Sequence, residues 1–272
     1  MRPSAAEAAG LLRALLQPKA AVSLGAKLLA GVGVAGLGAA VLFSLFANPE
    51  YAVDFQVTPA GASLYVDGQR LDGTLANVEP GLHQVLVVDQ DHFGQVIALD
   101  AQGDAEMPVT LEPIGEPTFE QFEQFNSLFQ NEVALDDLAG VDMPYLPYQQ
   151  LLKLKEHQLR GETSKIDAMV GDLNALAKVG DPAAQLMLFV ANFDQVITGD
   201  RFSGLIQQAS NSGYGLATFY QALHYRWARE RDDQLDIGSL QVYRSLMALA
   251  LEQGLEFAAQ FVEQADSVLQ SL

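Results

Sequence analysis

The stretches AKVGDPAAQ (177–185), ASNSGYGLA (209–217) and ALEQGLEFA (250–258) repeat one arrangement of small residues. In each, an alanine comes three or four residues before a glycine, and another alanine follows that glycine by four. Glycine can take the left-handed conformation that ends a helix, and alanine lets neighbouring helices cross closely. The pattern predicts helical hairpins with structural turn residues at Ala177, Gly180, Ala184, Ala209, Gly213, Ala217, Ala250, Gly254 and Ala258.

The three glycines lie 33 and 41 residues apart, which is a spacing typical of helical-hairpin repeats. Asp181 and Pro182 suit the N-cap and first position of a new helix. The stretch AKVGDPAAQLMLFV (177–190) resembles the Sel-one-like repeat, a short-helix relative of the tetratricopeptide repeat. The resemblance covers about 164–272 and weakens toward the end. It implies a curved, all-α repeat domain that holds other proteins.

A different periodicity precedes these helices. Alternating and β-branched residues, broken by turn-forming glycines and prolines, predict strands at 55–57, 63–66, 83–88, 95–99 and 107–111. The segment VTPAGASLYVDGQRLDGTLANVEPGLHQVLVV (57–88) resembles a PEGA domain through its PAGA, YVDG and PGLH motifs. This resemblance covers about 52–113. It implies a small extracytoplasmic β-sandwich of bacterial envelope proteins that serves as a spacer or binding module without catalysis.

Between these regions, residues 118–160 are expected to form linker helices. Phenylalanines at 119, 122, 125 and 129 form one stripe at helical spacing. Such a stripe either packs into a core or docks on a partner in helix-in-groove fashion. Phe119 and Phe122 are therefore candidate partner contacts as well as candidate core residues.

The beginning of the chain reads as a membrane anchor. Residues 28–47 carry no charge over a length that spans a bilayer as a helix, and all the nearby basic residues precede them. Gly31, Ala35 and Ala39 recur every four residues, which suits close packing of transmembrane helices. A cleaved signal peptide is the alternative, but the apolar run is longer than usual for one. A buried soluble helix is disfavoured because the run has no polar face.

The flanking charges place residues 1–27 in the cytoplasm and the rest outside, which for a bacterium means the periplasm. The predicted fold class is a membrane-anchored multidomain protein. It has one N-terminal transmembrane helix, a small all-β sandwich and an all-α solenoid of helical-hairpin repeats. The predicted location is the bacterial inner membrane, with residues 28–47 in the lipid bilayer.

No catalytic, cofactor or metal site is expected. The net charge of -19 disfavours nucleic acid as a partner, and the chain has no cysteine. Nucleophile-elbow, zinc-helix and phosphate-loop motifs do not occur. His83, Asp89, Asp91 and His92 lie close in sequence but lack the spacing of a calcium loop or a zinc site.

The predicted function is a non-catalytic scaffold that binds another envelope or membrane protein. In HYRWARERDD (224–233), Arg226, Trp227 and Arg229 are candidate contacts, and a repeat helix with an inward tryptophan is the alternative. A protein partner predicts a patch around 201–212 and 237–252. A glycan-facing module for peptidoglycan or exopolysaccharide instead predicts exposed aromatic side chains. A cleaved periplasmic hydrolase is a third, weaker reading.

Overall fold

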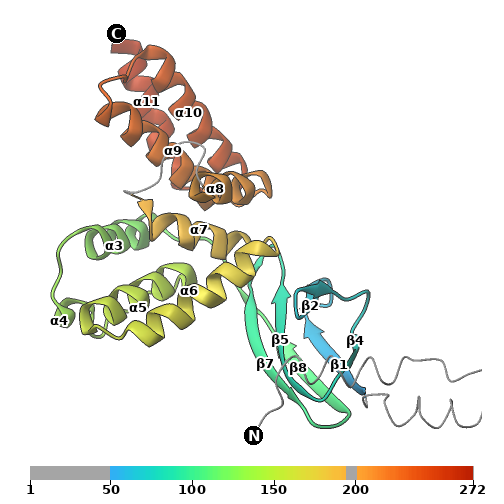
Figure 1. Cartoon of the computed structure of the whole chain (residues 1–272). Coiled ribbons are helices and arrows are strands. Elements are labelled where there is room, and N and C mark those ends of the chain that lie inside the picture. Colours follow the sequence, from blue (N-terminus) through green and yellow to red (C-terminus); the bar gives the residue numbers. More distant parts are fainter. Residues whose placement is uncertain (1–49, 194–200, 272) are drawn as a thin grey trace, which may run out of the picture. The chain divides into compact units, whose positions relative to one another are not determined.

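In the computed structural model, which describes residues 50–193 and 201–271, the strands all precede the helices (Figure 1). Turn residues such as Gly68, Gly73 and Gly81 separate short β-branched runs and have positive φ. The strands are β1 (Tyr51–Thr58), β2 (Ser63–Val66), β3 (Gln69–Arg70), β4 (Leu75–Val78), β5 (Gly81–Val88), β6 (His92–Phe93), β7 (Gln95–Ala101), β8 (Ala105–Thr110) and β9 (Glu112–Pro113).

These strands form two main sheets and one short ribbon. The four-stranded sheet has the order β3-β2-β5-β7, the three-stranded sheet has the order β4-β1-β8, and β6 pairs with β9. Val53 and Phe55 of β1 share a buried cluster with Val85 and Val87 of β5, as alternating inward-facing residues do. The sandwich is not purely antiparallel, because β1 and β8 run parallel, with Val57 opposite Val109.

The helices follow in pairs. In α6 to α11, each helix packs against the next one in the sequence. Two further helices, α3 and α5, pack against each other before them, with α4 against α5. The bounds are α3 (Phe119–Gln130), α4 (Leu135–Leu138), α5 (Leu146–Arg160), α6 (Thr163–Lys178), α7 (Pro182–Val190), α8 (Arg201–Asn211), α9 (Gly215–Arg231), α10 (Ile237–Glu252) and α11 (Ala258–Ser271).

Helices α3 and α5 are part of the helical core rather than a linker. The ring of Phe125 stacks on that of Tyr148, with centroids 4.1 Å apart. The ammonium group of Lys155 donates hydrogen bonds to three carbonyl groups just at or beyond the last turn of α3, those of Leu128, Phe129 and Asn131. Since the last carbonyls of a helix have no partner within the helix, Lys155 closes this end of α3.

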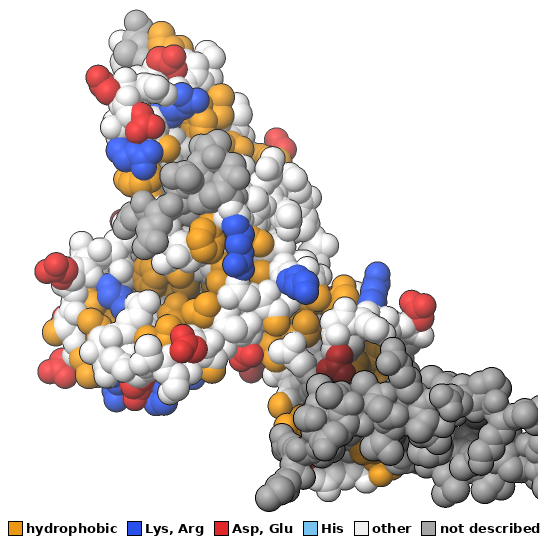
Figure 2. All heavy atoms as spheres, viewed as in Figure 1, with side chains coloured by type: hydrophobic (Ala, Val, Ile, Leu, Met, Phe, Trp, Pro, Cys, Tyr) orange, Lys and Arg blue, Asp and Glu red, His pale blue; other side chains and the backbone are white. Residues whose placement is uncertain are grey.

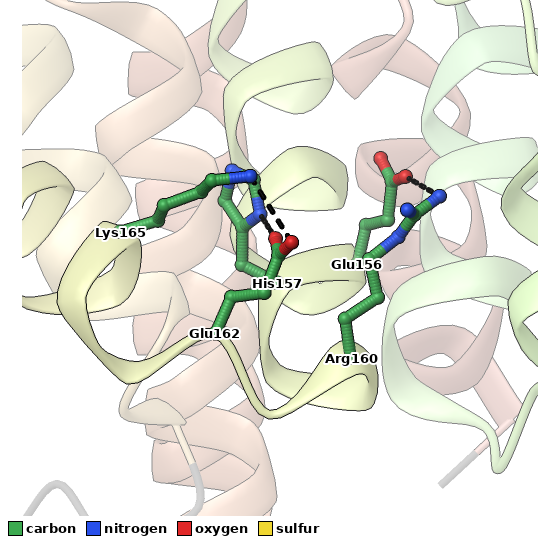
Figure 3. A network of polar contacts seen from close by, with 5 residues as sticks. All are labelled: Glu156, His157, Arg160, Glu162 and Lys165. Carbon is green, nitrogen blue, oxygen red and sulfur yellow. Dashed lines mark hydrogen bonds and ion pairs between the residues drawn. The ribbon is translucent and has the colours of Figure 1, made fainter.

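A polar network fixes the tight turn from α5 to α6 (Figure 3). The carboxylate of Glu162 lies 2.6 Å from Nδ1 of His157 and 3.0 Å from Nζ of Lys165. The hydrogen bond from Lys165 and that with His157 lower the pKa of Glu162. Gly161, with φ of 68°, lets the chain reverse between the two helices.

The predicted membrane-anchored fold class is wrong for the part of the chain that the structure describes. Among residues 50–193 and 201–271, no helix combines the length and the apolar character needed to cross a membrane. The predicted span 28–47, its small residues Gly31, Ala35 and Ala39, and the segment 1–27 lie outside the described residues. That prediction rested on length and hydropathy alone.

The β module, defined as residues 51–113, also does not stand apart from the helices. Leu86 and Val88 of β5 belong to the same buried cluster as the helical core, as does Ile114. Residues from Glu50 onward form one compact unit. The described protein is therefore a mixed α and β structure with a shared core, because alternate side chains of β5 face two different neighbours.

Candidate protein-interaction site

The three repeated glycines close the turns of the hairpins α6–α7, α8–α9 and α10–α11. Gly180, Gly213 and Gly254 have φ of 97°, 94° and 102°. In this left-handed region glycine lacks the steric cost that a side chain brings. The six alanines assigned to the turns are all buried. These motif residues therefore shape the scaffold, and their alanine side chains offer no surface for a ligand.

The backbone hydrogen bonds correct the register in which the three turns were aligned. In each turn, the residue after the glycine donates to a carbonyl four residues before that glycine: Asp181 to Leu176, Tyr214 to Ala209, and Leu255 to Ala250. Leu176, and not Ala177, is therefore the counterpart of Ala209 and Ala250. The neighbouring alanine hid this shift in the sequence.

The β module and the segment that follows it contact all three turns. The backbone N–H of Gly94 donates to the Asp181 carboxylate at 3.0 Å, and the amide of Gln90 donates to the carbonyl of Ser212. At the third turn, a Cβ on Gly254 would collide with the Glu116 carboxylate. The three turns therefore connect the helices of each hairpin and also contact the β module and the segment after it.

Asp181 has two roles at the first of these contacts. Its Oδ1 accepts from the N–H of Ala184 at 2.6 Å and caps α7, while Oδ2 accepts from Gly94. Only 1% of the residue is exposed. Burial raises the pKa of Asp181 to about 6, against the opposing effect of these backbone donors.

Next to the second and third turns lies a pocket of about 210 Å³. One wall comes from the loop after β5 and the segment that leads into α3. The other comes from the start of α9 and the turn after α10. The lining residues are Gln90, Asp91, Ile114, Gly115, Glu116, Pro117, Gly213, Tyr214, Gly215, Leu216, Gln253 and Leu255.

The phenylalanine stripe of α3 packs inward. Phe122 is 7% exposed and stacks on Phe257, with ring centroids 5.6 Å apart. Phe119 is partly buried against Phe257 and Phe261. Of the two alternatives for this stripe, Phe122 follows core packing and not partner contact, because α9 and α11 already cover its side of α3.

The basic cluster of α9 mainly serves the protein itself. Trp227 is half-buried, with its ring 5.8 Å from that of Phe193. The guanidinium of Arg226 lies 2.7 Å from Glu230 and over the ring of Tyr243. Arg229 donates to the side chain of Gln234 and lies over Tyr225, and it also lines a hollow of about 610 Å³ beside α8 and α9. The structure thus matches the inward-tryptophan alternative for Arg226 and Trp227.

An uncharged surface runs along α10, the first helix of the last hairpin. Gly238, Val242, Ser245 and Leu249 are all exposed, and steps of four, three and four residues separate them. We call these four residues the α10 stripe. Val242 is 43% and Leu249 39% exposed, and Ile237 is 53% exposed at its start. Hydrophobic side chains are visible at the surface over the C-terminal helices (Figure 2).

A partner-binding patch is predicted near 237–252 from the sequence, but no sequence signal singled out these four residues. The sequence feature that could have identified the stripe is its spacing in steps of three and four residues. These steps lie on the helix face opposite the buried Leu240, Tyr243, Met247 and Ala250. Because aliphatic residues cover both faces of α10, periodicity alone did not separate the exposed ones.

The titratable groups at the turns of the β module form isolated pairs. Within the described part of the chain, no three His, Asp or Glu side chains are grouped to hold a metal ion. Nδ1 of His83 lies 2.6 Å from the carboxylate of Asp67, and Nδ1 of His92 lies 2.6 Å from that of Asp89. These histidines and aspartates link neighbouring turns of the β module.

The chain matches no family model, no curated protein and no solved structure. The resemblances to PEGA domains and to Sel-one-like repeats therefore stay predictions that rest on the quoted motifs.

Proposed function

We propose that this protein is a non-catalytic scaffold whose last helical hairpin binds an amphipathic helix of another protein along the α10 stripe. The observation that carries the proposal is the exposed, uncharged surface of Gly238, Val242, Ser245 and Leu249. In repeat proteins each hairpin covers the apolar face of its neighbour, and a terminal repeat needs a polar outer face to remain alone in water. Here Val242 and Leu249 place exposed aliphatic side chains on that face.

The spacing selects the kind of partner. Residues four and three apart along a helix form the seam at which two helices pack with a small crossing angle. Val242 and Leu249 supply aliphatic side chains to such a seam, while Gly238 and Ser245 let a second helix approach closely. A partner helix with a matching apolar face therefore fits this surface better than a loop or a strand.

The alternative of a glycan-facing module has less support. Sugar rings commonly stack on exposed aromatic side chains, whereas the exposed large hydrophobic residues in the described part of this chain are all aliphatic. The aromatic rings of α3, α9 and α11 pack against one another.

The test is a double substitution on the stripe. Full-length protein with Val242→Asp and Leu249→Asp should lose its partner, and Leu159→Asp is the matched control because Leu159 is 47% exposed on α5. Proteins crosslinked to each version in cells would be identified, and the strongest candidate would be purified and its affinity measured. Burying two aliphatic side chains contributes a few kcal/mol, so we expect an affinity loss of at least tenfold.

Two outcomes would overturn the proposal. If the purified partner binds the stripe variant and the control equally well, the stripe is not its site. If the wild-type chain is a dimer by light scattering and the stripe variant is a monomer, a second copy covers the surface and no other protein is required.

A further inference from the structure

The pocket between the linker segment 114–117 and the last two repeat turns has a chemistry separate from that of the α10 stripe. Its lining includes two acidic residues, Asp91 and Glu116, and no basic residue. The carboxylate of Glu116 makes no hydrogen bond or ion pair with the residues that the structure describes. Burial raises the pKa of Glu116, and the nearby charge of Glu256 adds to this effect. Glu116 remains an exposed residue, so its carboxylate is accessible to a cation, which would stabilise the charged form.

The backbone adds negative potential at the same place. Helix α8 ends at Asn211 and α10 ends at Glu252, both next to pocket residues. The carbonyl end of a helix carries a partial negative charge, which basic side chains often neutralise. Neither α8 nor α10 has a basic residue in its last turn. The start of α9 brings a positive helix end to the same wall, so the net negative charge of the lining comes from Asp91 and Glu116.

The remaining walls are apolar. Ile114, Leu216 and Leu255 are buried residues that also line the pocket. A bare metal ion would gain nothing from such walls, and no metal-binding group of side chains occurs among the described residues. A long basic side chain combines a hydrocarbon stem with a charged end, and proteins often bury the stem against apolar surface.

We propose that this pocket receives a lysine or arginine side chain of a partner protein, with Glu116 as the counter-ion for its ammonium or guanidinium group. The hydrocarbon stem would lie against Ile114, Leu216 and Leu255. The pocket shares no residue with the α10 stripe, so this proposal goes beyond the proposed scaffold function and stands or falls separately from it.

A short peptide can test the site on the full chain. The probe is acetyl-Gly-Lys-Gly-amide, and the matched probe replaces lysine with norleucine, which keeps the stem and removes the charge. Binding would be followed by NMR through the backbone amide signals of Gly213, Gly215 and Gly254, which line or adjoin the pocket. We expect the lysine peptide to shift these signals in a saturable manner and the norleucine peptide to leave them unchanged.

The variant Glu116→Gln should weaken binding of the lysine peptide at least tenfold, while Glu120→Gln, on the exposed first turn of α3, should bind like the wild type. Because Glu116 is exposed and makes no hydrogen bond or ion pair with the described residues, the glutamine variant should fold, and its dispersed glycine signals would verify this. The stripe variant Val242→Asp with Leu249→Asp should bind the peptide normally, which separates this test from that of the scaffold function.

Four results would overturn the proposal. The first is equal binding by Glu116→Gln, and the second is equal shifts with the norleucine peptide. The third is that n-butylamine binds as well as the peptide, since the pocket would then recognise a free amine and not a protein side chain. The fourth is that calcium chloride at matched ionic strength displaces the lysine peptide, since the pocket would then bind a metal ion and not a side chain.

Discussion

Oδ2 of Asp181 accepts a hydrogen bond from the backbone N–H of Gly94, which joins the first repeat turn to the end of the β module. The two residues are 87 positions apart in the sequence. The other oxygen of the same carboxylate caps α7 through Ala184. One buried side chain thus sets both the start of a repeat helix and the position of the strands against it.

Replacing Asp181 with asparagine should destabilise the protein at pH 7. An amide has one acceptor oxygen, so either the N–H of Ala184 or that of Gly94 loses its partner. A buried donor without an acceptor costs about 1–3 kcal/mol. Urea unfolding followed by circular dichroism would measure the change. An unaltered midpoint would show that the two hydrogen bonds contribute nothing.

The same pair of proteins should respond differently to pH. Because the pKa of Asp181 is raised to about 6 in the folded state, protonation favours folding. The stabilisation is complete below the ordinary pKa of about 3.8 and is lost as the pH rises through about 6. Between pH 7 and pH 5, wild type should gain about 1 kcal/mol relative to Asp181→Asn. A constant difference across this range would contradict the assignment.

Two glycines only two residues apart should fail for different reasons. A Cβ on Gly215 would lie 3.0 Å from the carbonyl oxygen of Ala250, whereas a Cβ on Gly213 would meet only the end of the Gln90 side chain, at 3.5 Å. Gly213→Ala should therefore cost about 1 kcal/mol through its positive φ. Gly215→Ala should separate α9 from the end of α10 and cost about 1–3 kcal/mol.

Thermal unfolding of both alanine variants and of Gly213→Val would check this. Valine at 213 should be worse than alanine, because a branched side chain fits the left-handed conformation poorly. A Gly213→Val protein that melts like the wild type would rule out a structural role for the motif glycine. A Gly215→Ala protein without change would mean that α10 can move away at no cost.

The end of α3 should depend on one lysine. Lys155→Met removes hydrogen bonds of 2.6–2.8 Å to three carbonyls while keeping most of the side-chain stem. Hydrogen bonds to charged groups are stronger than neutral ones, so we expect a loss of about 2 kcal/mol. Lys153→Met, two residues earlier on the exposed side of α5, is the control. Equal stability of the two variants in urea would contradict the role assigned to Lys155.

Local signals in the sequence identified the elements well. Asp181, Pro182 and Gly180 mark the boundary between α6 and α7, and the structure ends and begins these helices next to them. Alternating residues located most of the longer strands. The pairing of β1 with β8 was not predictable, because a parallel pair requires a long crossover and leaves no mark in either strand.

The candidate sites were harder to foresee. Glu116 and Gly254 lie next to each other at the third turn but are far apart in the chain, so no spacing rule connects them. For the aromatic side chains, the sequence left open whether they face a partner or the core. Phe122 and Trp227 look like partner contacts in isolation, and only the packing of α3 on α9 and α11 shows where their rings are used.

Contacts from Gly94, Gln90 and Glu116 to three successive turns have a consequence for how this architecture can vary. Most solenoids lengthen or shorten by duplicating or deleting one unit, since each unit touches only its neighbours. Here residues beside the paired strands β6 and β9 contact all three turns, so an inserted hairpin would move every later turn away from its matching contact. These contacts therefore fix the number of helical hairpins. A change in the number of hairpins requires a simultaneous change in residues 90–116, which make the contacts.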